Sequence, residues 1–157
     1  MPTDITVTVV VEPPTAPDVV ALLTEHLDEM HATSPRESVH AFDLGRLQGP
    51  DIVFVTARGD DGTLLGCGAL KLHDGLAEIK SMRTTAGARG RGVATSVLLT
   101  LLDLARERGM AQVSLETGAE DHFAPARRLY SRHGFTSCPP FADYTDDPLS
   151  VYLTRSL

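Results

Sequence analysis

The stretch LAEIKSMRTTAGARGRGVATSVLLTLLDLARERG, residues 76–109, joins a strand pattern, a glycine-rich loop and a helix pattern in immediate succession. The residues over 76–84 follow a short turn and are typical of a strand. Between residues 92 and 108 the apolar side chains recur every three or four positions, which predicts a long amphipathic helix that ends at Gly109. We therefore expect residues 87–96 to connect a strand directly to a helix N-terminus.

The rest of the chain supplies the other elements of a mixed α/β sheet in one domain, residues 1–157. Strands are expected at 5–11, 51–58, 63–73, 76–84, 112–117, 135–138 and 149–155, and helices at 18–30, from Ser34 and Pro35 onward, at 92–108 and at 124–133. The order is β-α-α-β-β-β-α-β-α-β-β. Short turns predict an antiparallel meander over 51–84, whereas the helix after residue 92 predicts that strands 76–84 and 112–117 run parallel.

The composition excludes several classes of protein. The 157 residues are 42% apolar and 22% charged, as in ordinary globular domains, and the net charge of -7 argues against a general nucleic-acid binder. We expect no contact with a membrane, because the longest apolar runs are far shorter than a bilayer requires. Two separated cysteines, and a start without a basic region, favour a reducing cytoplasmic setting.

The loop GARGRGVATS, residues 87–96, is expected to bind an anion. N–H groups in the first turn of a helix lack intrahelical partners, and the helix dipole favours negative charge there. Glycine lets the backbone approach a ligand, and arginine binds phosphate in a bidentate manner. The alternative is a solvated turn with two surface arginines.

Two nucleotide-binding patterns fit this loop poorly. A P-loop needs a lysine after its last glycine, and none follows here. A dinucleotide-binding fingerprint needs three glycines; Gly90 and Gly92 supply two, but Thr95 holds the third place, although Glu116 resembles the acidic ribose ligand. A nicotinamide-dependent enzyme therefore stays a weaker alternative.

The segment from Arg89 to Ala94 instead matches the pattern R/Q-x-x-G-x-G/A, and ARRLYSRHGF, residues 126–135, matches A-x-x-L-Y-x-x-x-G-F. Both segments resemble the GNAT superfamily of acyl-CoA N-acyltransferases, and the likeness covers nearly the whole chain, most clearly 51–137. The resemblance implies a GNAT-like fold, in which the central, mostly antiparallel sheet splays open between strands 76–84 and 112–117.

The resemblance also implies acetyl-CoA as the co-substrate. Backbone groups of Met82 and Thr84 would pair with the pantetheine arm. The pyrophosphate would lie on the N–H groups of Arg89, Gly90, Arg91, Gly92, Val93, Ala94 and Thr95. In such a site the backbone amides matter more than the arginine side chains.

Tyr130 is the leading catalytic candidate by resemblance, because many family members place there a tyrosine that protonates the departing thiolate. A positioned phenol can hydrogen-bond a sulfur as negative charge develops on it. The alternative is a tyrosine of the core, since Ala126, Leu129 and Tyr130 share one helical face.

A general base is needed to take the proton of the attacking amine. Glu78 ranks first and Glu116 second. Strict alternation would place Glu78 on one face of its strand with Lys80 and Met82. The alternative for Glu78 is a structural ion pair with Lys80.

The acceptor site is expected to come from the helical segment 26–43 and the late loop 139–147. The candidate residues are His31, Ser34, Arg36, His40, Phe141 and Tyr144; His122 and Phe123 either line the site or cap a helix. No metal site is expected, because His26 and His31 lack the spacing of helical zinc ligands.

These features together predict an N-acetyltransferase that transfers an acetyl group directly from acetyl-CoA to the amine of a small molecule. A sensor that binds acyl-CoA without turnover is the alternative from another functional class. A homodimer, with strand 149–155 at its interface, is a further expectation.

Overall fold

The structure is a computed structural model that describes residues 6–33 and 45–157, with only the backbone of residues 30–33. The strands are β1 (Thr8–Val11), β2 (Ile52–Arg58), β3 (Leu64–Leu72), β4 (Leu76–Thr84), β5 (Gln112–Gly118), β6 (Thr136–Ser137) and β7 (Ser150–Ser156). The helices are α1 (Pro17–Thr33), α2 (Val93–Glu107) and α3 (Ala124–Arg132), with short 3-10 turns η2 (Arg46–Gln48), η3 (Ala86–Ala88) and η4 (Asp121–Phe123).

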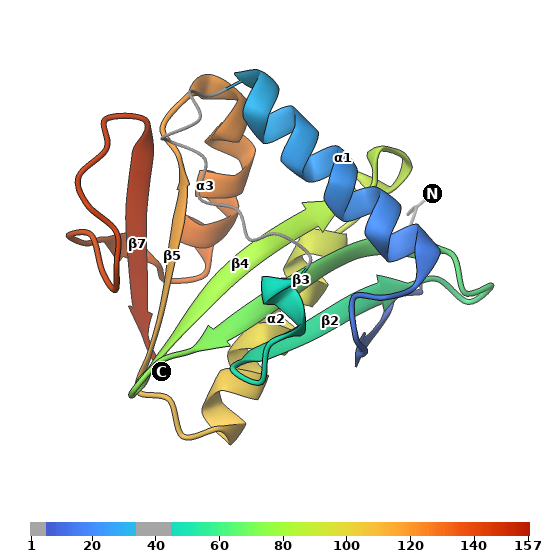
Figure 1. Cartoon of the computed structure of the whole chain (residues 1–157), viewed down its shortest axis with the longest axis horizontal. Coiled ribbons are helices and arrows are strands. Elements are labelled where there is room, and N and C mark those ends of the chain that lie inside the picture. Colours follow the sequence, from blue (N-terminus) through green and yellow to red (C-terminus); the bar gives the residue numbers. More distant parts are fainter. Residues whose placement is uncertain (1–5, 34–44) are drawn as a thin grey trace.

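Among the described residues, seven strands form one sheet in the order β1-β2-β3-β4-β5-β7-β6 (Figure 1). The pair β4 and β5 is parallel, and the other adjacent pairs are antiparallel. The predicted mixed α/β fold, with its meander and its crossover through α2, is therefore confirmed.

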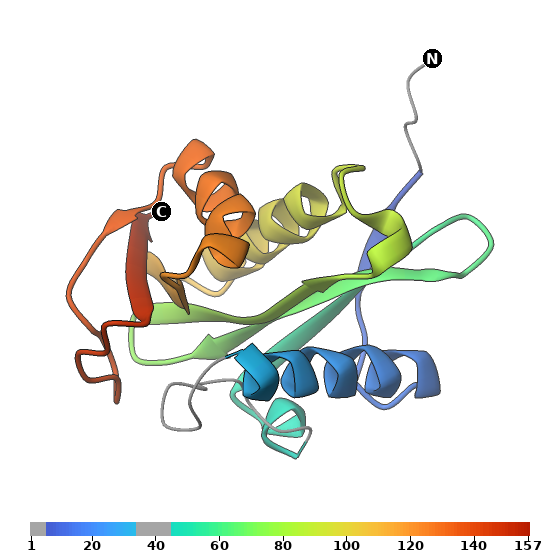
Figure 2. The same cartoon turned by 90° about the horizontal axis from the view of Figure 1, so that it is seen from above.

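Helices cover both faces of the sheet. Figure 2 shows α1 on one face and both α2 and α3 on the other. The apolar stripe of α2 packs into the larger core cluster through Val93, Val97, Leu98, Leu101, Leu102 and Ala105, which are the residues that its spacing predicted. The smaller cluster joins α1 to β2 and β3, with Val19 and Cys67 fully buried.

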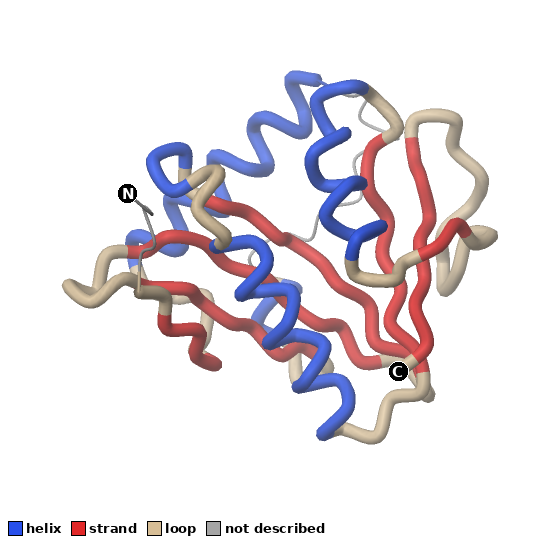
Figure 3. Tube along the Cα trace, turned by 180° about the vertical axis from the view of Figure 1, so that it is seen from behind, coloured by secondary structure: helices blue, strands red, loops and turns tan. Residues whose placement is uncertain are grey.

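The strands β4 and β5 pair over only part of their length. Their register runs from Leu76 opposite Gln112 to Ile79 opposite Leu115, and within these two described strands the pairing stops there. Beyond this point the strands separate, as Figure 3 shows from behind. The predicted splay between the two strands is present.

A β-bulge lies in β4 just where the two strands separate. Lys80 pairs with Ala69 and Arg83 pairs with Cys67, so the register with β3 shifts by one residue. Ser81, inside the shift, has a φ of 57°. An extra residue of this kind reverses the alternation of side chains beyond it.

The bulge corrects the expectation that Glu78, Lys80 and Met82 share a face. Glu78 and Lys80 are hydrogen-bonded on the α1 face, where Arg83 also contacts α1. Met82 instead packs against the cluster that contains α2. A strict period of two fails here because the bulge inserts one residue between Lys80 and Met82.

The first strand starts later than predicted, and one predicted helix is not tested. The strand expected from residue 5 begins at Thr8 in the structure; residues 6 and 7 are described and are not part of it, whereas residue 5 lies outside the described residues. The short helix expected from Ser34 and Pro35 lies outside the described residues. None of the described helices has the length and apolar character that crossing a membrane requires.

The close contact between β3 and α2 depends on Gly68. A Cβ at this position would lie 2.8 Å from a methyl carbon of Val97 and 3.0 Å from one of Leu101. We expect Gly68→Ala to lower the free energy of unfolding by about 1–3 kcal/mol, because the packed helix must shift. Urea denaturation measures this change.

Gly87→Ala is the matched control, because a Cβ at Gly87 meets nothing within 4 Å. Its effect should stay within about 0.5 kcal/mol. Equal losses for the two variants would contradict the packing argument.

Candidate active site

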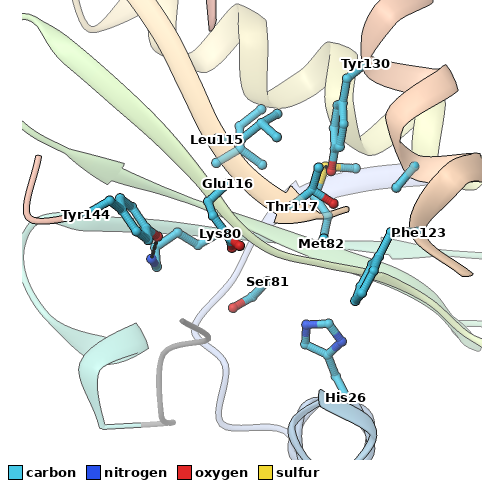
Figure 4. A pocket seen from close by; sticks show the side chains of 13 residues that line it. His26, Lys80, Ser81, Met82, Leu115, Glu116, Thr117, Phe123, Tyr130 and Tyr144 are labelled. Atoms are coloured by element: carbon cyan, nitrogen blue, oxygen red, sulfur yellow. Dashed lines mark hydrogen bonds between the residues drawn. The ribbon is translucent and has the colours of Figure 1, made fainter. Parts of the chain in front are cut away.

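A cavity of about 130 Å³ lies where β4 and β5 separate. Its walls are formed by side chains from β4, β5, α1 and α3 and from the loop between β6 and β7 (Figure 4). The lining residues are His26, Ile79, Lys80, Ser81, Met82, Leu115, Glu116, Thr117, Gly118, Phe123, Ala126, Tyr130 and Tyr144.

Tyr130 enters the cavity from α3. Its hydroxyl lies 3.6 Å from the sulfur of Met82, and its ring packs edge-on against Phe135 with the centroids 5.7 Å apart. Burial, and to a smaller extent the charge of Glu116, raises the pKa of the phenol. The hydroxyl therefore stays protonated near neutral pH and remains a hydrogen-bond donor.

Glu78 is buried and accepts several hydrogen bonds. The Tyr144 hydroxyl donates to Oε2 at 2.6 Å, Nζ of Lys80 donates to the same atom at 3.0 Å, and Nε2 of His73 lies 3.0 Å from Oε1. Burial alone would raise the pKa of this carboxyl, but the Lys80 charge and these hydrogen bonds outweigh it and lower the pKa. The predicted ion pair with Lys80 is present.

Lys80 and Tyr144 connect this buried carboxylate to the cavity. Nζ of Lys80 donates to the Tyr144 hydroxyl at 2.8 Å, and both residues line the cavity. Burial lowers the pKa of Lys80, although Glu78 opposes this effect, and burial together with Glu78 raises the pKa of Tyr144. These contacts tie the late loop to β4.

Glu116 lies at the opposite wall, on β5. Its Oε2 accepts a hydrogen bond from the Ser150 hydroxyl at 2.7 Å. Of the two carboxylates predicted as bases, Glu116 is the one that lines the cavity, whereas Glu78 lies behind Lys80 and Tyr144.

The glycine-rich loop forms an exposed turn before α2. Gly90 and Gly92 have φ values of 77° and 81°, and a Cβ at either would meet nothing within 4 Å. Ala88 and Val93 are buried on either side and anchor the turn. The first N–H groups of α2 lie at this turn, so the backbone can approach an anion closely.

Of the other predicted site residues that the structure describes, some line the cavity and others lie outside it. Met82 lines the cavity, whereas Thr84 lies at the end of β4 outside the lining set. Phe141 packs against Tyr144 with ring centroids 5.1 Å apart. Phe123 lines the cavity, and His122 is exposed beside it.

Four acceptor-site candidates are not tested by the structure. Ser34, Arg36 and His40 lie outside the described residues, and the same holds for the side chain of His31.

Among the polar side chains of the cavity, sequence reasoning did not name His26, Lys80, Ser81 and Thr117 as site residues. The helical pattern of α1 does not indicate whether His26 is buried or exposed. Its place in the cavity wall follows from the packing of α1 across β4. Within the part of the chain that the structure describes, no group of three or more His, Cys, Asp or Glu residues is placed to hold a metal ion.

Comparison with known proteins agrees with this geometry. The model of the acetyltransferase (GNAT) family matches residues 19–135. The chain belongs to the GNAT family. It is 50% identical over 145 residues to the uncharacterised N-acetyltransferase YsnE of Bacillus subtilis, across 91% of this chain and 95% of that protein.

Solved structures share the same fold. A candidate acyl-CoA N-acyltransferase from Klebsiella pneumoniae superposes with a TM-score of 0.80 at 29% identity, covering 97% of this chain and 98% of that one. PaiA N-acetyltransferase from Thermoplasma acidophilum, solved with coenzyme A, gives 0.74 at 14% identity over 97% and 99%. At this low sequence identity, the second comparison shows only that the two proteins share a fold.

The family assignment confirms that the protein is an acyltransferase of the GNAT type. The alternative of a nicotinamide-dependent enzyme is set aside, because one parallel strand pair does not build the doubly wound sheet that such enzymes use.

The buried cluster around Glu78 predicts a pH-dependent effect on stability. Lys80→Met leaves a buried carboxylate without its ammonium partner, so we expect a loss of about 3 kcal/mol in the free energy of unfolding at neutral pH. The folded pKa of Glu78 lies below its ordinary value of 4.5, so the ion pair contributes stability above that pH and loses it in more acidic solution.

The difference between the two proteins should therefore shrink in a urea titration series as the solution becomes acidic enough to protonate Glu78. Arg106→Met is the control, because its pair with Asp103 is exposed, and it should cost less than about 0.5 kcal/mol. A loss for Lys80→Met that is independent of pH would contradict this account.

Proposed function

We propose that this protein is an N-acetyltransferase that moves an acetyl group from acetyl-CoA to the amine of a small molecule. The observation that carries the proposal is the cavity between the separating ends of β4 and β5, with Tyr130 in its wall and the glycine-rich turn between β4 and α2. The cytoplasmic location, the single domain over 1–157 and the homodimer stay predictions.

The residues present fit acetyl-CoA at this opening. The backbone of β4 beyond Ile79 is not paired with β5, so Met82 and Thr84 can pair with the amide groups of the pantetheine arm. The N–H groups from Arg89 to Thr95 would hold the pyrophosphate, with the arginine side chains in support. When bound, acetyl-CoA supplies an activated acyl group as its thioester.

Tyr130 acts as the general acid in this proposal. Its side chain lines the cavity between β4 and β5, so its hydroxyl can donate to a thiolate that forms there. The raised pKa keeps the proton on the phenol until negative charge develops on the leaving sulfur. Backbone N–H groups of the bulged β4 would polarise the acyl carbonyl.

Glu116 takes the proton of the attacking amine in this proposal. Glu116 lines the cavity and also accepts a hydrogen bond from Ser150, whereas Glu78 is outside the lining set and accepts hydrogen bonds from Lys80 and Tyr144. This reverses the ranking from the sequence. Glu78 then positions Lys80 and Tyr144 at the acceptor side of the cavity, with Phe141 packed behind Tyr144.

A small acceptor is favoured by the size and polarity of the cavity. About 130 Å³ accommodates a compact molecule, and Lys80, Glu116 and Tyr144 present charged and hydroxyl groups to it. The acceptor contacts expected from His31, Ser34, Arg36 and His40 remain predictions.

A charge in the turn before α2 tests the binding of acetyl-CoA. We expect Gly92→Glu to weaken the affinity for acetyl-CoA about a hundredfold, because a carboxylate would face the phosphates. Isothermal titration calorimetry measures the affinity.

Gly109→Glu is the matched control, since Gly109 also has a positive φ of 74° and an open Cβ position, but lies at the other end of α2. Its affinity should match that of the unchanged protein. An equal loss of affinity for acetyl-CoA in both variants would contradict the proposal that the glycine-rich turn binds the phosphates.

Removal of one hydroxyl tests the general acid. We expect Tyr130→Phe to lower kcat about a hundredfold and to leave the affinity for acetyl-CoA unchanged, because the phenol acts on the leaving sulfur. Release of free CoA across a panel of small amines measures turnover.

Tyr152→Phe is the control, because its hydroxyl donates to the carbonyl of Thr145 rather than into the cavity, and it should keep kcat within about threefold. Binding of acetyl-CoA by the unchanged protein, without turnover of any amine, would support the sensor alternative and overturn the proposed reaction.

A further inference from the structure

We propose that His26 is an acceptor-binding residue, and that its imidazole hydrogen-bonds a polar group of the acceptor other than the reacting amine. The inference rests on the proposed acetyl transfer and narrows its substrate class. The acceptor is then a bifunctional amine that carries a hydroxyl or amide group.

His26 reaches the cavity from the face of the sheet opposite to Tyr130. α1 and α3 cover different faces of the sheet (Figure 2). The side chains of His26 and Tyr130 nevertheless line the same cavity. Figure 4 shows His26 extending from α1 toward Ser81 and Phe123, while Tyr130 enters from the other side. Since Tyr130 faces the leaving sulfur, the end at His26 belongs to the acceptor.

The imidazole of His26 has an unsatisfied polar atom. Its Nδ1 is buried and has no hydrogen-bond partner among the residues that the structure describes. Buried polar atoms without a partner are rare in folded proteins. Because the imidazole lines the cavity, a polar atom of a ligand that enters it can hydrogen-bond this ring, and a buried hydrogen bond of this kind stabilises the complex.

The charges around His26 indicate which groups it can recognise. Burial and the nearby Arg83 guanidinium lower the pKa of His26 to about 4, although Glu29 opposes this effect. The ring is therefore neutral at pH 7 and offers one donor and one acceptor. Such a ring suits a hydroxyl or an amide better than a carboxylate, which prefers a cation.

His26 is not required to hold α1 on the sheet. Arg83 on β4 makes ion pairs of 2.8 Å with Glu25 and 2.6 Å with Glu29, on either side of His26 along the helix. The apolar residues Val19, Leu22 and Leu23 of α1 also pack into the smaller core cluster. The effect of a substitution at His26 on turnover can therefore be attributed to the changed cavity wall and not to a displaced α1.

The test compares amines of matched length. Short amino alcohols and amino amides are each paired with the n-alkylamine of equal length, and kcat and KM are measured with saturating acetyl-CoA. We expect the unchanged protein to prefer the polar amine about tenfold in kcat/KM, through one buried hydrogen bond.

In His26→Leu the KM of the polar amine should rise about tenfold, so that the preference disappears, while the KM of the alkylamine and the affinity for acetyl-CoA stay unchanged. His26→Asn, which keeps a polar atom near the place of Nδ1, should retain part of the preference. Thr24→Leu, an exposed position on the same helix, is the control. Should His26→Leu not fold, His26→Ala provides the same comparison.

The outcomes separate the two proposals. Turnover of polar amines and alkylamines with equal efficiency by the unchanged protein would overturn the inference and leave the acetyl transfer standing. An undiminished preference in His26→Leu or His26→Ala would also overturn the inference. Absence of turnover with every amine would overturn both proposals.

Discussion

The rest of the site depends on one interruption, the end of parallel pairing between β4 and β5 after Ile79 and Leu115. Backbone groups beyond that point need other partners, because buried amides and carbonyls are almost always hydrogen-bonded. The bulge at Ser81 turns β4 away at the same place. The separation opens a passage between the two helix-covered faces of the sheet, so groups on opposite faces can act on one cavity.

The charged groups are arranged around this passage. Glu78, Lys80 and Tyr144 form a buried cluster that ties the late loop to β4, and Glu116 faces the cavity from β5. Glu78, Lys80 and Glu116 therefore lie on strands, and Tyr144 is held by its hydrogen bonds to residues of β4. Reactive groups held by rigid elements need little rearrangement when a substrate binds, and this favours catalysis by positioning and electrostatics.

The sequence predicted the parts of this protein that depend on local pattern. The spacing of apolar residues identified the buried face of α2 residue by residue, and short turns identified the meander. The two motifs around Gly92 and Tyr130 identified the family. Alternation along β4 failed at Met82, because a bulge depends on pairing with β3 and has no local signal in this strand.

The amino-acid sequence by itself determined the order of the elements, the helix that starts at the glycine-rich turn and the tyrosine on α3, because periodicity and turn chemistry act over a few residues. Only the tertiary structure decided which carboxylate faces the cavity and that His26 lines it. The reason is physical: Glu78 is engaged by Lys80, Tyr144 and His73, partly from a distant loop, and α1 meets the cavity only by packing across β4.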